Sequence, residues 1–255
     1  MHPELLSWIR DDLAKAREML ERFSPPPLPI SSGFECYAMC RQLVEIGGDY
    51  YDFVVRPDEG FVLAIGDVSG KAISAALMLS NLRAILHNEL QRHTDNLVGL
   101  MTKLNRLVAE ASPMGRYITL FYGQYDARTS RLHYVNAGHN YPLLFRRLSK
   151  NGAPRELLIG GVPLGIMAEP PQPYEQGREI IRPGDVLVAY TDGIVEVGSA
   201  AGKEWGLDSL ISLVQDQIDH SAKEIGDSIV AAVDKFGEGN ALNDDMTLLV
   251  LKALA

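Results

Sequence analysis

The chain has 255 residues, of which 46% are hydrophobic and 22% charged, a composition ordinary for a soluble globular protein. Its 33 acidic and 24 basic side chains give a net charge of −9, which disfavours nucleic-acid binding because that needs clustered Lys and Arg. No apolar stretch approaches the roughly 18 residues of a membrane span, and the charged N-terminus is not a secretory signal. We therefore expect a cytoplasmic protein whose two cysteines, Cys36 and Cys40, are reduced.

Residues 1–24 are predicted to form an amphipathic helix, a linker or regulatory element ahead of the main domain. Apolar residues recur in it with helical period, at Leu5, Leu6, Ile9, Leu13, Ala16, Leu20 and Phe23. Residues 25–33 are rich in proline and form a stiff connector, which leaves 34–255 as one domain. The apolar stripe needs a partner surface, and we expect it to pair with a second chain in a homodimer, the alternative being that it folds back on the domain.

After the connector, strands dominate and helices come in consecutive pairs. Strands are predicted at 34–46, 50–55, 61–65, 117–126, 131–138, 141–147, 185–192 and 246–254, with weaker ones around 157–159 and 179–181. Helices are predicted at 71–90 and 96–111, the latter capped by Thr94 or Asp95, and at 207–218 and 222–236. This order favours an α+β fold of antiparallel sheets layered with helices over alternating βαβ units.

A carboxylate stands where several of the predicted strands begin or end. Asp49 precedes a strand in "EIGGDYYDF", Asp67 ends one in "AIGDVSG", and Asp192 ends another in "VLVAYTDGI". Asp244 and Asp245 precede the last strand in "NDDMTLLVL". For any one of these acids the simpler interpretation is a turn or a helix cap, as for Asp67 ahead of the next helix.

Taken together, strand ends that meet at one edge of a sheet would bring these acids within reach of one another. Clustered carboxylates repel unless a cation neutralises them, and oxygen ligands suit Mg²⁺ or Mn²⁺. Two such ions can activate a hydroxide for attack on phosphorus. The acids alone leave both the metal site and the turn-residue interpretation open.

Six motifs in order resemble those of the PPM metal-dependent protein phosphatases, in the bacterial SpoIIE/RsbU-like branch. They are "EIGGDYYDF", "AIGDVSGKAISAALM", "VNAGHNYPLL", "VPLGI", "GDVLVAYTDGIVE" and "NDDMTLLVL". Each motif is weak alone, but six with sensible spacing over residues 34–252 are highly specific. The resemblance implies a β-sandwich of two antiparallel sheets flanked by helices, and hydrolysis of phosphoserine or phosphothreonine in proteins.

The resemblance also implies roles for individual residues. Asp67 resembles the carboxylate that bridges two Mn²⁺ or Mg²⁺ ions, and Val68 would ligate one of them through its backbone carbonyl. Asp192 resembles a ligand of the other ion, and Asp49 an acid that holds the second ion partly through water. Asp244 matches the family's ligand in the last motif better than Asp245, which could share the task.

Two positions depart from the family pattern. Ala72 replaces the usual glycine after Lys71, and no arginine of the phosphate-binding kind stands near Asp49. Phosphate binding is then left to the metal ions, with or without help from Lys71, for which an ordinary solvated helix residue is the favoured interpretation. His139 in "NAGHNYP" could act as a general acid, but a hydrogen-bonded structural role is favoured, and Trp205 is assigned to the core.

The sequence thus predicts a protein serine/threonine phosphatase that uses a metal-activated hydroxide. Members of this branch act on a phosphorylated regulatory protein, typically a STAS-type anti-anti-sigma factor, in stress responses and sigma-factor regulation. Two other functions stay open. One is a two-metal phosphodiesterase, which could use similar carboxylates, and the other is a non-catalytic signalling module that binds a partner.

Overall fold

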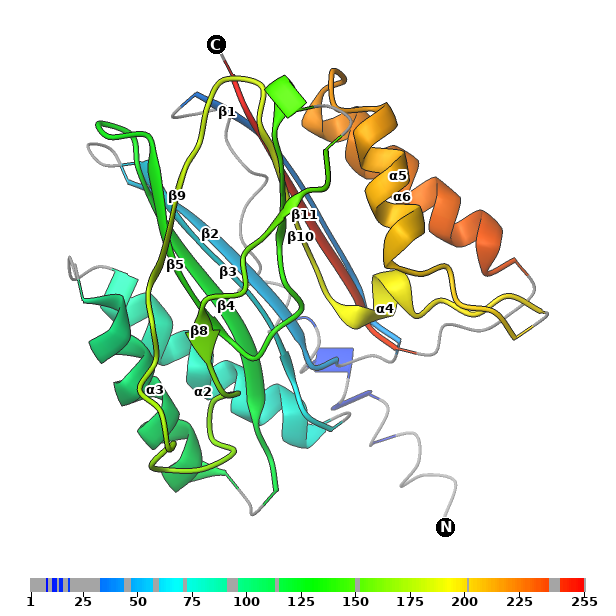
Figure 1. Ribbon diagram of the computed structural model, residues 1–255. Coiled ribbons are helices and arrows are strands. Elements are labelled where there is room, and N and C mark those ends of the chain that lie inside the picture. Colours follow the sequence, from blue (N-terminus) through cyan, green and yellow to red (C-terminus); the bar gives the residue numbers. More distant parts are fainter. Residues whose placement is uncertain are drawn as a thin grey trace.

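The computed structural model covers most of the chain after residue 32 and a few residues before it. The described residues are 8, 11, 12, 14, 15 and 18, then 33–43, 47–56, 60–70, 73–90, 96–112, 115–149, 152–200, 202–238 and 244–254. Over these ranges two β-sheets pack face to face and helices cover both outer faces, which gives four layers (Figure 1). The expected α+β sandwich is confirmed.

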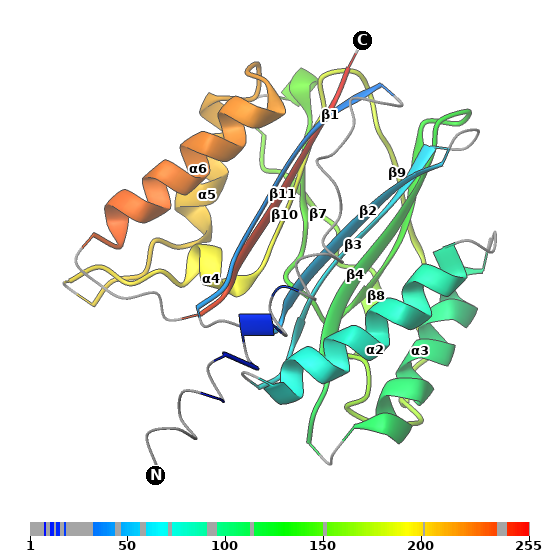
Figure 2. The same ribbon diagram turned by 180° about the vertical axis from the view of Figure 1, so that it is seen from behind.

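One sheet brings the first and last strands of the domain together. Its order is β1-β11-β10-β6-β7, formed by β1 (Phe34–Arg41), β11 (Met246–Ala253), β10 (Val186–Tyr190), β6 (Leu143–Phe145) and β7 (Arg155–Glu156). All of its strand pairs are antiparallel. Helices α5 (Leu207–Asp216) and α6 (Ala222–Phe236) cover its outer face (Figure 2).

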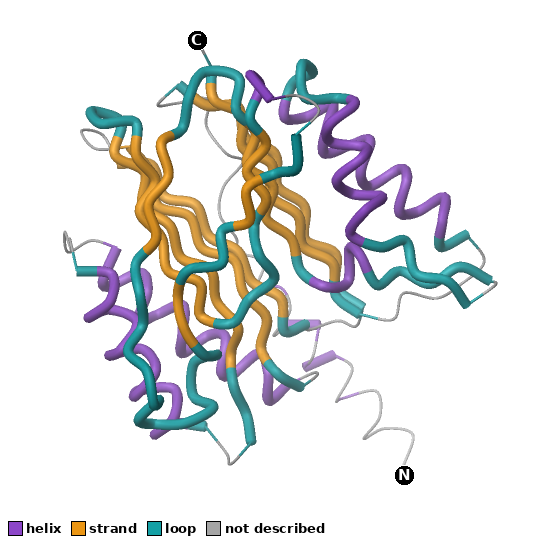
Figure 3. Tube along the Cα trace, viewed as in Figure 1, coloured by secondary structure: helices purple, strands orange, loops and turns teal. Residues whose placement is uncertain are grey.

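The other sheet is built around four strands that follow one another along the chain. Its order is β2-β3-β4-β5-β8, formed by β2 (Asp49–Arg56), β3 (Gly60–Val68), β4 (Ile118–Asp126), β5 (Arg131–Ala137) and β8 (Gly160–Gly161), with β9 (Gly177–Ile180) also paired to β5. Helices α2 (Ile73–Leu90) and α3 (Leu97–Ala111) cover its outer face (Figure 3). Two short helices lie in connections between strands of the first sheet: η1 (Arg147–Ser149) follows β6 and α4 (Asp192–Val195) follows β10.

Strand β3 shows how the sequence builds these layers. Successive side chains of a strand point to opposite faces, and in β3 both faces are buried. Phe61, Leu63 and Ile65 pack between the two sheets, whereas Val62 and Ala64 pack against α2 and α3. Burial on both faces explains why this segment is a continuous apolar run without alternation.

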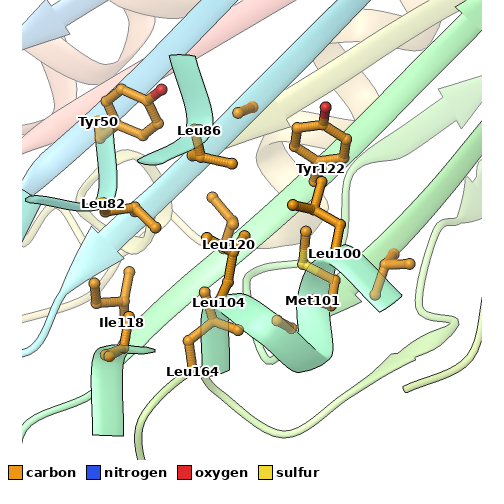
Figure 4. Close-up of a cluster of buried hydrophobic side chains, with 14 of the residues drawn as sticks. Tyr50, Leu82, Leu86, Leu100, Met101, Leu104, Ile118, Leu120, Tyr122 and Leu164 are labelled. Atoms are coloured by element: carbon orange, nitrogen blue, oxygen red, sulfur yellow. The ribbon is translucent and has the colours of Figure 1, made fainter. Parts of the chain in front are cut away.

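The core beneath α2 and α3 is closely packed. Leu82 and Leu86 of α2 and Leu104 of α3 are buried and meet Leu120 and Tyr122 of β4 (Figure 4). Both helices are thus held firmly on the sheet that carries Asp67.

Several details differ from the sequence-based elements, and one is that residues 157–159 are not a strand but lie between β7 and β8. The first strand ends at Arg41 instead of running on to residue 46. The cap of α3 is Asn96, whose side chain accepts a hydrogen bond from Gly99 N, so Thr94 and Asp95 were wrong choices. The four-residue helix α4 was not predicted, since a single turn leaves no periodic pattern to detect.

Six residues of the N-terminal segment are described, and all are helical and exposed: Trp8, Asp11, Asp12, Ala14, Lys15 and Glu18. The residues of the predicted apolar stripe lie outside the described ones, so its pairing stays a prediction. Among the described residues, no helix is both long and apolar enough to cross a membrane.

Candidate metal centre

The acids identified in the sequence lie at one end of the sandwich. Asp49 begins β2 and Asp67 lies next to the last residue of β3, and the two are direct partners in the β2–β3 pairing. β10 ends shortly before Asp192, and β11 begins directly after Asp244 and Asp245. Two strands therefore run toward this end and two start from it, which explains why acids scattered along the chain meet there.

Strand alternation turns several of these positions toward the space between the sheets. In β3 the residues packed between the sheets include Leu63 and Ile65, so the next position on that face is Asp67. In β11 the same step of two from Leu249 leads to Thr247. Polar residues thus take over the inner faces where the apolar core ends.

Asp49 is buried, with 4% of its surface exposed, and it bonds to hydroxyls of the opposite sheet. Thr191 Oγ1 and Thr247 Oγ1 each donate to Asp49 Oδ2 at 2.7 Å. Burial raises the pKa of Asp49 well above its usual value, the two hydroxyls lower it, and the charges of Asp67 and Asp245 raise it further. Asp49 therefore ties the two sheets together.

Asp67 is a strand residue and not a helix cap, because it lies within β3 and pairs with Asp49 of β2 and Thr119 of β4. Burial, together with the negative charges of Asp192, Asp244 and Asp245, raises the pKa of Asp67 to about 7. The charges of the neighbouring acids thus add to the effect of burial in disfavouring an ionised Asp67. The interpretation of Asp67 as a cap of the next helix is therefore excluded.

Asp192 and Asp244 are partly exposed and stand at the starts of neighbouring segments. Asp192 begins α4, and its Oδ1 accepts a hydrogen bond from Gly193 N at 2.8 Å. Asp244 Oδ1 accepts one from Asp245 N at 3.0 Å. An ideal Cβ on Gly193 would lie 1.9 Å from the carbonyl oxygen of Asp245, so only glycine allows these two segments to touch.

Asp245 has a different role, because both of its carboxylate oxygens bind backbone amides. Leu43 N donates to Oδ1 and Gly48 N donates to Oδ2, each at 2.7 Å. An ideal Cβ on Gly47 would lie 2.2 Å from Oδ2 of the same carboxylate. Asp245 therefore anchors both ends of the connection that leads from β1 to Asp49.

Gly48 keeps a space open in front of two candidate ligands. An ideal Cβ on Gly48 would lie 2.9 Å from the carbonyl oxygen of Val68 and 3.1 Å from Asp67 Oδ1. Any larger residue would fill this space and press on both oxygens. The two oxygens therefore border one small volume that the sequence leaves free.

His139 is a structural residue, as the sequence favoured. It is 2% exposed, and its Nδ1 lies 2.9 Å from Thr119 Oγ1, while its backbone N–H donates to Asn136 Oδ1. Burial lowers the pKa of His139 to about 3. It therefore stays neutral at physiological pH. Trp205 is also buried in the core, as predicted.

Sequence reasoning missed an arginine beside this end of the sandwich. Arg116, just before β4, donates from Nη1 to the carbonyl oxygen of Ser69 at 2.7 Å. An ideal Cβ on Gly70, which has a φ of 101°, would lie 1.3 Å from that nitrogen. Arg116 thus braces the loop after Asp67, a contact across the β3–β4 pairing that spacing along the chain could not reveal. Lys71 and Ala72 lie outside the described residues.

Two threonines and a glutamate were also missed. Thr191 and Thr247 could have been found as polar residues at inward positions of apolar strands. Burial and the charges of Asp192, Glu204 and Asp244 raise the pKa of Glu196, which closes the motif "GDVLVAYTDGIVE". Glu196 and Glu204 therefore add negative charge near Asp192 beyond that of the aspartates.

The residues present fit a divalent cation. Carboxylate and carbonyl oxygens are the donors that Mg²⁺ and Mn²⁺ prefer, and the space beside Gly48 is bordered by one of each. Within the described ranges no three His, Cys, Asp or Glu side chains already converge tightly enough to hold a metal.

A family model supplies the identification. The model for stage II sporulation protein E (SpoIIE) matches residues 57–254, most of the chain. The chain belongs to the SpoIIE family. It is a PPM-type serine/threonine protein phosphatase of the SpoIIE/RsbU branch, as the motifs indicated.

Several proteins of other organisms are similar to this chain in sequence. Phosphoserine phosphatase RsbU of Bacillus subtilis (strain 168) is 27% identical over 246 residues, which are 96% of this chain and 70% of RsbU. The chain spans only 41% of IcfG of Synechocystis and 49% of RsbP of B. subtilis.

Solved structures show the same fold. The SiaA-PP2C domain of Pseudomonas aeruginosa superposes with a TM-score of 0.78 at 18% identity, over 97% of this chain and 98% of that domain. The catalytic domain of the phosphatase PstP, in complex with 2 manganese ions, gives 0.62 at 15% identity, over 87% of this chain and 99% of that one.

Proposed function

We propose that this SpoIIE-family protein removes phosphate from phosphoserine or phosphothreonine of a regulatory protein, with two Mn²⁺ or Mg²⁺ ions at the candidate metal centre. The observation that carries the proposal is the gathering of acids around the buried Asp67, whose pKa is raised to about 7 by burial first and then by the charges of Asp192, Asp244 and Asp245. Such crowding is unfavourable unless a cation compensates it. The name of RsbU supports the phosphoserine substrate, and the two manganese ions of PstP support the number of ions.

Asp67, the carbonyl oxygen of Val68, Asp49, Asp192 and Asp244 would hold the ions. Asp245 is a poorer candidate than Asp244, because both of its oxygens already accept backbone hydrogen bonds. When bound, the ions would supply an activated water and neutralise charge on the phosphate.

The chain's own residues then have three tasks. Asp67 must give up its proton to bind a cation. Asp245 holds the connection before Asp49 in place through the amides of Leu43 and Gly48. His139 is neutral and buried, and a neutral imidazole is too weak an acid to protonate the departing serine oxygen at pH 7, so that proton would come from solvent.

The protein partner is proposed to be a phosphorylated STAS-type anti-anti-sigma factor in the cytoplasm. Similarity to RsbU and the SpoIIE family match support a regulatory phosphoprotein, and the net charge of −9 argues against a nucleic-acid substrate.

A phosphatase assay tests this function. Protein stripped of metal should show no release of phosphate from a phosphoserine peptide, and Mn²⁺ or Mg²⁺ should restore it. Asp67→Asn and Asp192→Asn should each lose most of the restored activity while keeping a cooperative melting transition. Asp216→Asn, which changes an exposed acid at the end of α5, is the matched control.

Undiminished turnover in excess chelator would contradict the metal mechanism. Cleavage of an oligonucleotide in place of the phosphopeptide would identify a phosphodiesterase. Metal binding without any hydrolysis would leave a partner-binding module.

A further inference from the structure

Thr191 and Thr247 approach Asp49 from the sheet opposite to its own. Asp49 begins β2, whereas Thr191 follows β10 and Thr247 lies in β11. Both threonines are 0% exposed, and both hydroxyls donate to the same oxygen, Asp49 Oδ2, at 2.7 Å. We call these three residues the threonine–aspartate latch.

The two threonines are also joined to each other. Thr191 N donates to the carbonyl oxygen of Thr247 at 3.0 Å, and Thr247 N donates to Thr191 Oγ1 at 2.9 Å. Each hydroxyl carries a single proton, and the short contacts direct both protons to Asp49. The amide of Thr247 occupies Thr191 Oγ1 as an acceptor and so fixes how the Thr191 hydroxyl turns. Thr247 Oγ1 also lies 3.3 Å from Cys40 Sγ, but its contact with the Asp49 carboxylate is shorter, and a carboxylate is the stronger acceptor.

The latch leaves the two oxygens of Asp49 in different states. Oδ2 receives both hydroxyl protons, whereas Oδ1 accepts no hydrogen bond from any described residue. Asp49 is also the direct strand partner of Asp67. The carboxylate is thus fixed in rotation, with one oxygen committed to the fold and the other left for a ligand beside Asp67.

We propose that Thr191 and Thr247 are positioning residues that orient Asp49 so that Oδ1 alone serves the metal centre. This inference rests on the proposed function, because it assumes that Asp49 binds a cation. Groups that orient a ligating carboxylate typically change metal affinity by about 10- to 100-fold when they are removed. A purely structural role would change the melting temperature and leave the affinity alone.

Calorimetric titration of metal-stripped protein with Mn²⁺ tests the latch without measuring turnover. Thr191→Val and Thr247→Val should each weaken the affinity for at least one Mn²⁺ about 10-fold or more. Thr191→Ser keeps the hydroxyl and should bind Mn²⁺ as the wild type does. Thr102→Val is the matched control, since its exposed hydroxyl bonds only to the carbonyl oxygen of Val98 in α3. Thr247→Val keeps the Thr247 amide bond to Thr191, so it remains testable if Thr191→Val does not fold.

A double-variant comparison makes the test specific to Asp49. In an Asp49→Ala background, Thr247→Val should cause no further loss of Mn²⁺ affinity, because the residue through which it acts is gone. Folded threonine variants that bind Mn²⁺ as tightly as the wild type would overturn the latch. So would a Thr247→Val change that weakens Mn²⁺ affinity as much in the Asp49→Ala background as in the wild type. A wild type that binds no Mn²⁺ would instead overturn the proposed function.

Discussion

Asp67 in the metal-free protein keeps its proton to a higher pH than an exposed carboxyl does, because burial and three neighbouring acids disfavour its charge. Between about pH 4 and pH 7 the folded state therefore holds a proton that the unfolded state has released. Stability is then greatest below the usual carboxyl pKa and is lost as the pH rises toward 7.

We expect the melting temperature of the chelator-treated wild type to fall as the pH rises from 5 to 8. Asp67→Asn should flatten this fall, since an amide has no charge to bury, and Asp216→Asn should not. Thermal melts in chelator at several pH values provide the measurement. Parallel curves for the wild type and Asp67→Asn would show that repulsion at Asp67 does not affect stability.

The residues of the site could be predicted from the sequence only where their chemistry shows along the chain. Asp49, Asp67, Asp192 and Asp244 stand out because each acid adjoins a strand and occurs in a recognisable motif. Nothing along the chain distinguishes Asp245 from Asp244, because its role depends on amides about two hundred residues earlier in the chain.

At the scale of elements, the connection between β1 and β2 depends on a single side chain of the segment before β11. Asp245 accepts hydrogen bonds from Leu43 N and Gly48 N and so joins the first strands of the domain to the last one. Asp244, next to it, bonds Asp245 N and raises the pKa of Asp67.

Neighbouring alanine substitutions should separate these two roles. Asp245→Ala leaves two amides without their acceptor and should lower the free energy of unfolding of the metal-free protein by about 2 kcal/mol. Both variants remove a negative charge near Asp67, but Asp244→Ala deprives only one amide, Asp245 N, of its acceptor. Its stability should therefore stay closer to the wild type while its Mn²⁺ affinity drops. Urea denaturation and calorimetry on both variants measure this. Equal losses of stability would contradict the division of roles.

Elements with a repeating pattern were predictable and those formed by long-range contacts were not. The apolar strands β3, β10 and β11 and the amphipathic helix α6 appear close to their expected bounds. The strands β7 and β8 have two residues each and are defined by their pairing with β6 and β5, so the sequence indicated only the apolar residues between them.

At the scale of the whole molecule, the N-terminal segment is the part whose packing is open to test. Its apolar stripe is predicted to pair with that of a second chain. The double variant Leu13→Glu with Leu20→Glu should convert a dimer into a monomer, because unpaired charges are costly to bury between two paired helices. Phosphatase activity should change with it. Multi-angle light scattering gives the mass. A monomeric wild type at high concentration would contradict the pairing.

The ends of the domain offer a different consequence. Phe34 pairs with Ala253, and Leu254 N donates to the carbonyl oxygen of Gly33 at 2.7 Å. A short linker could therefore join residue 254 to residue 33, and new termini could be opened in the exposed turn at 127–130. Such a circular permutant would keep every strand beside its present neighbour. Its metal centre should survive, since the site depends on the order of strands in space and not on the order in which the ribosome makes them.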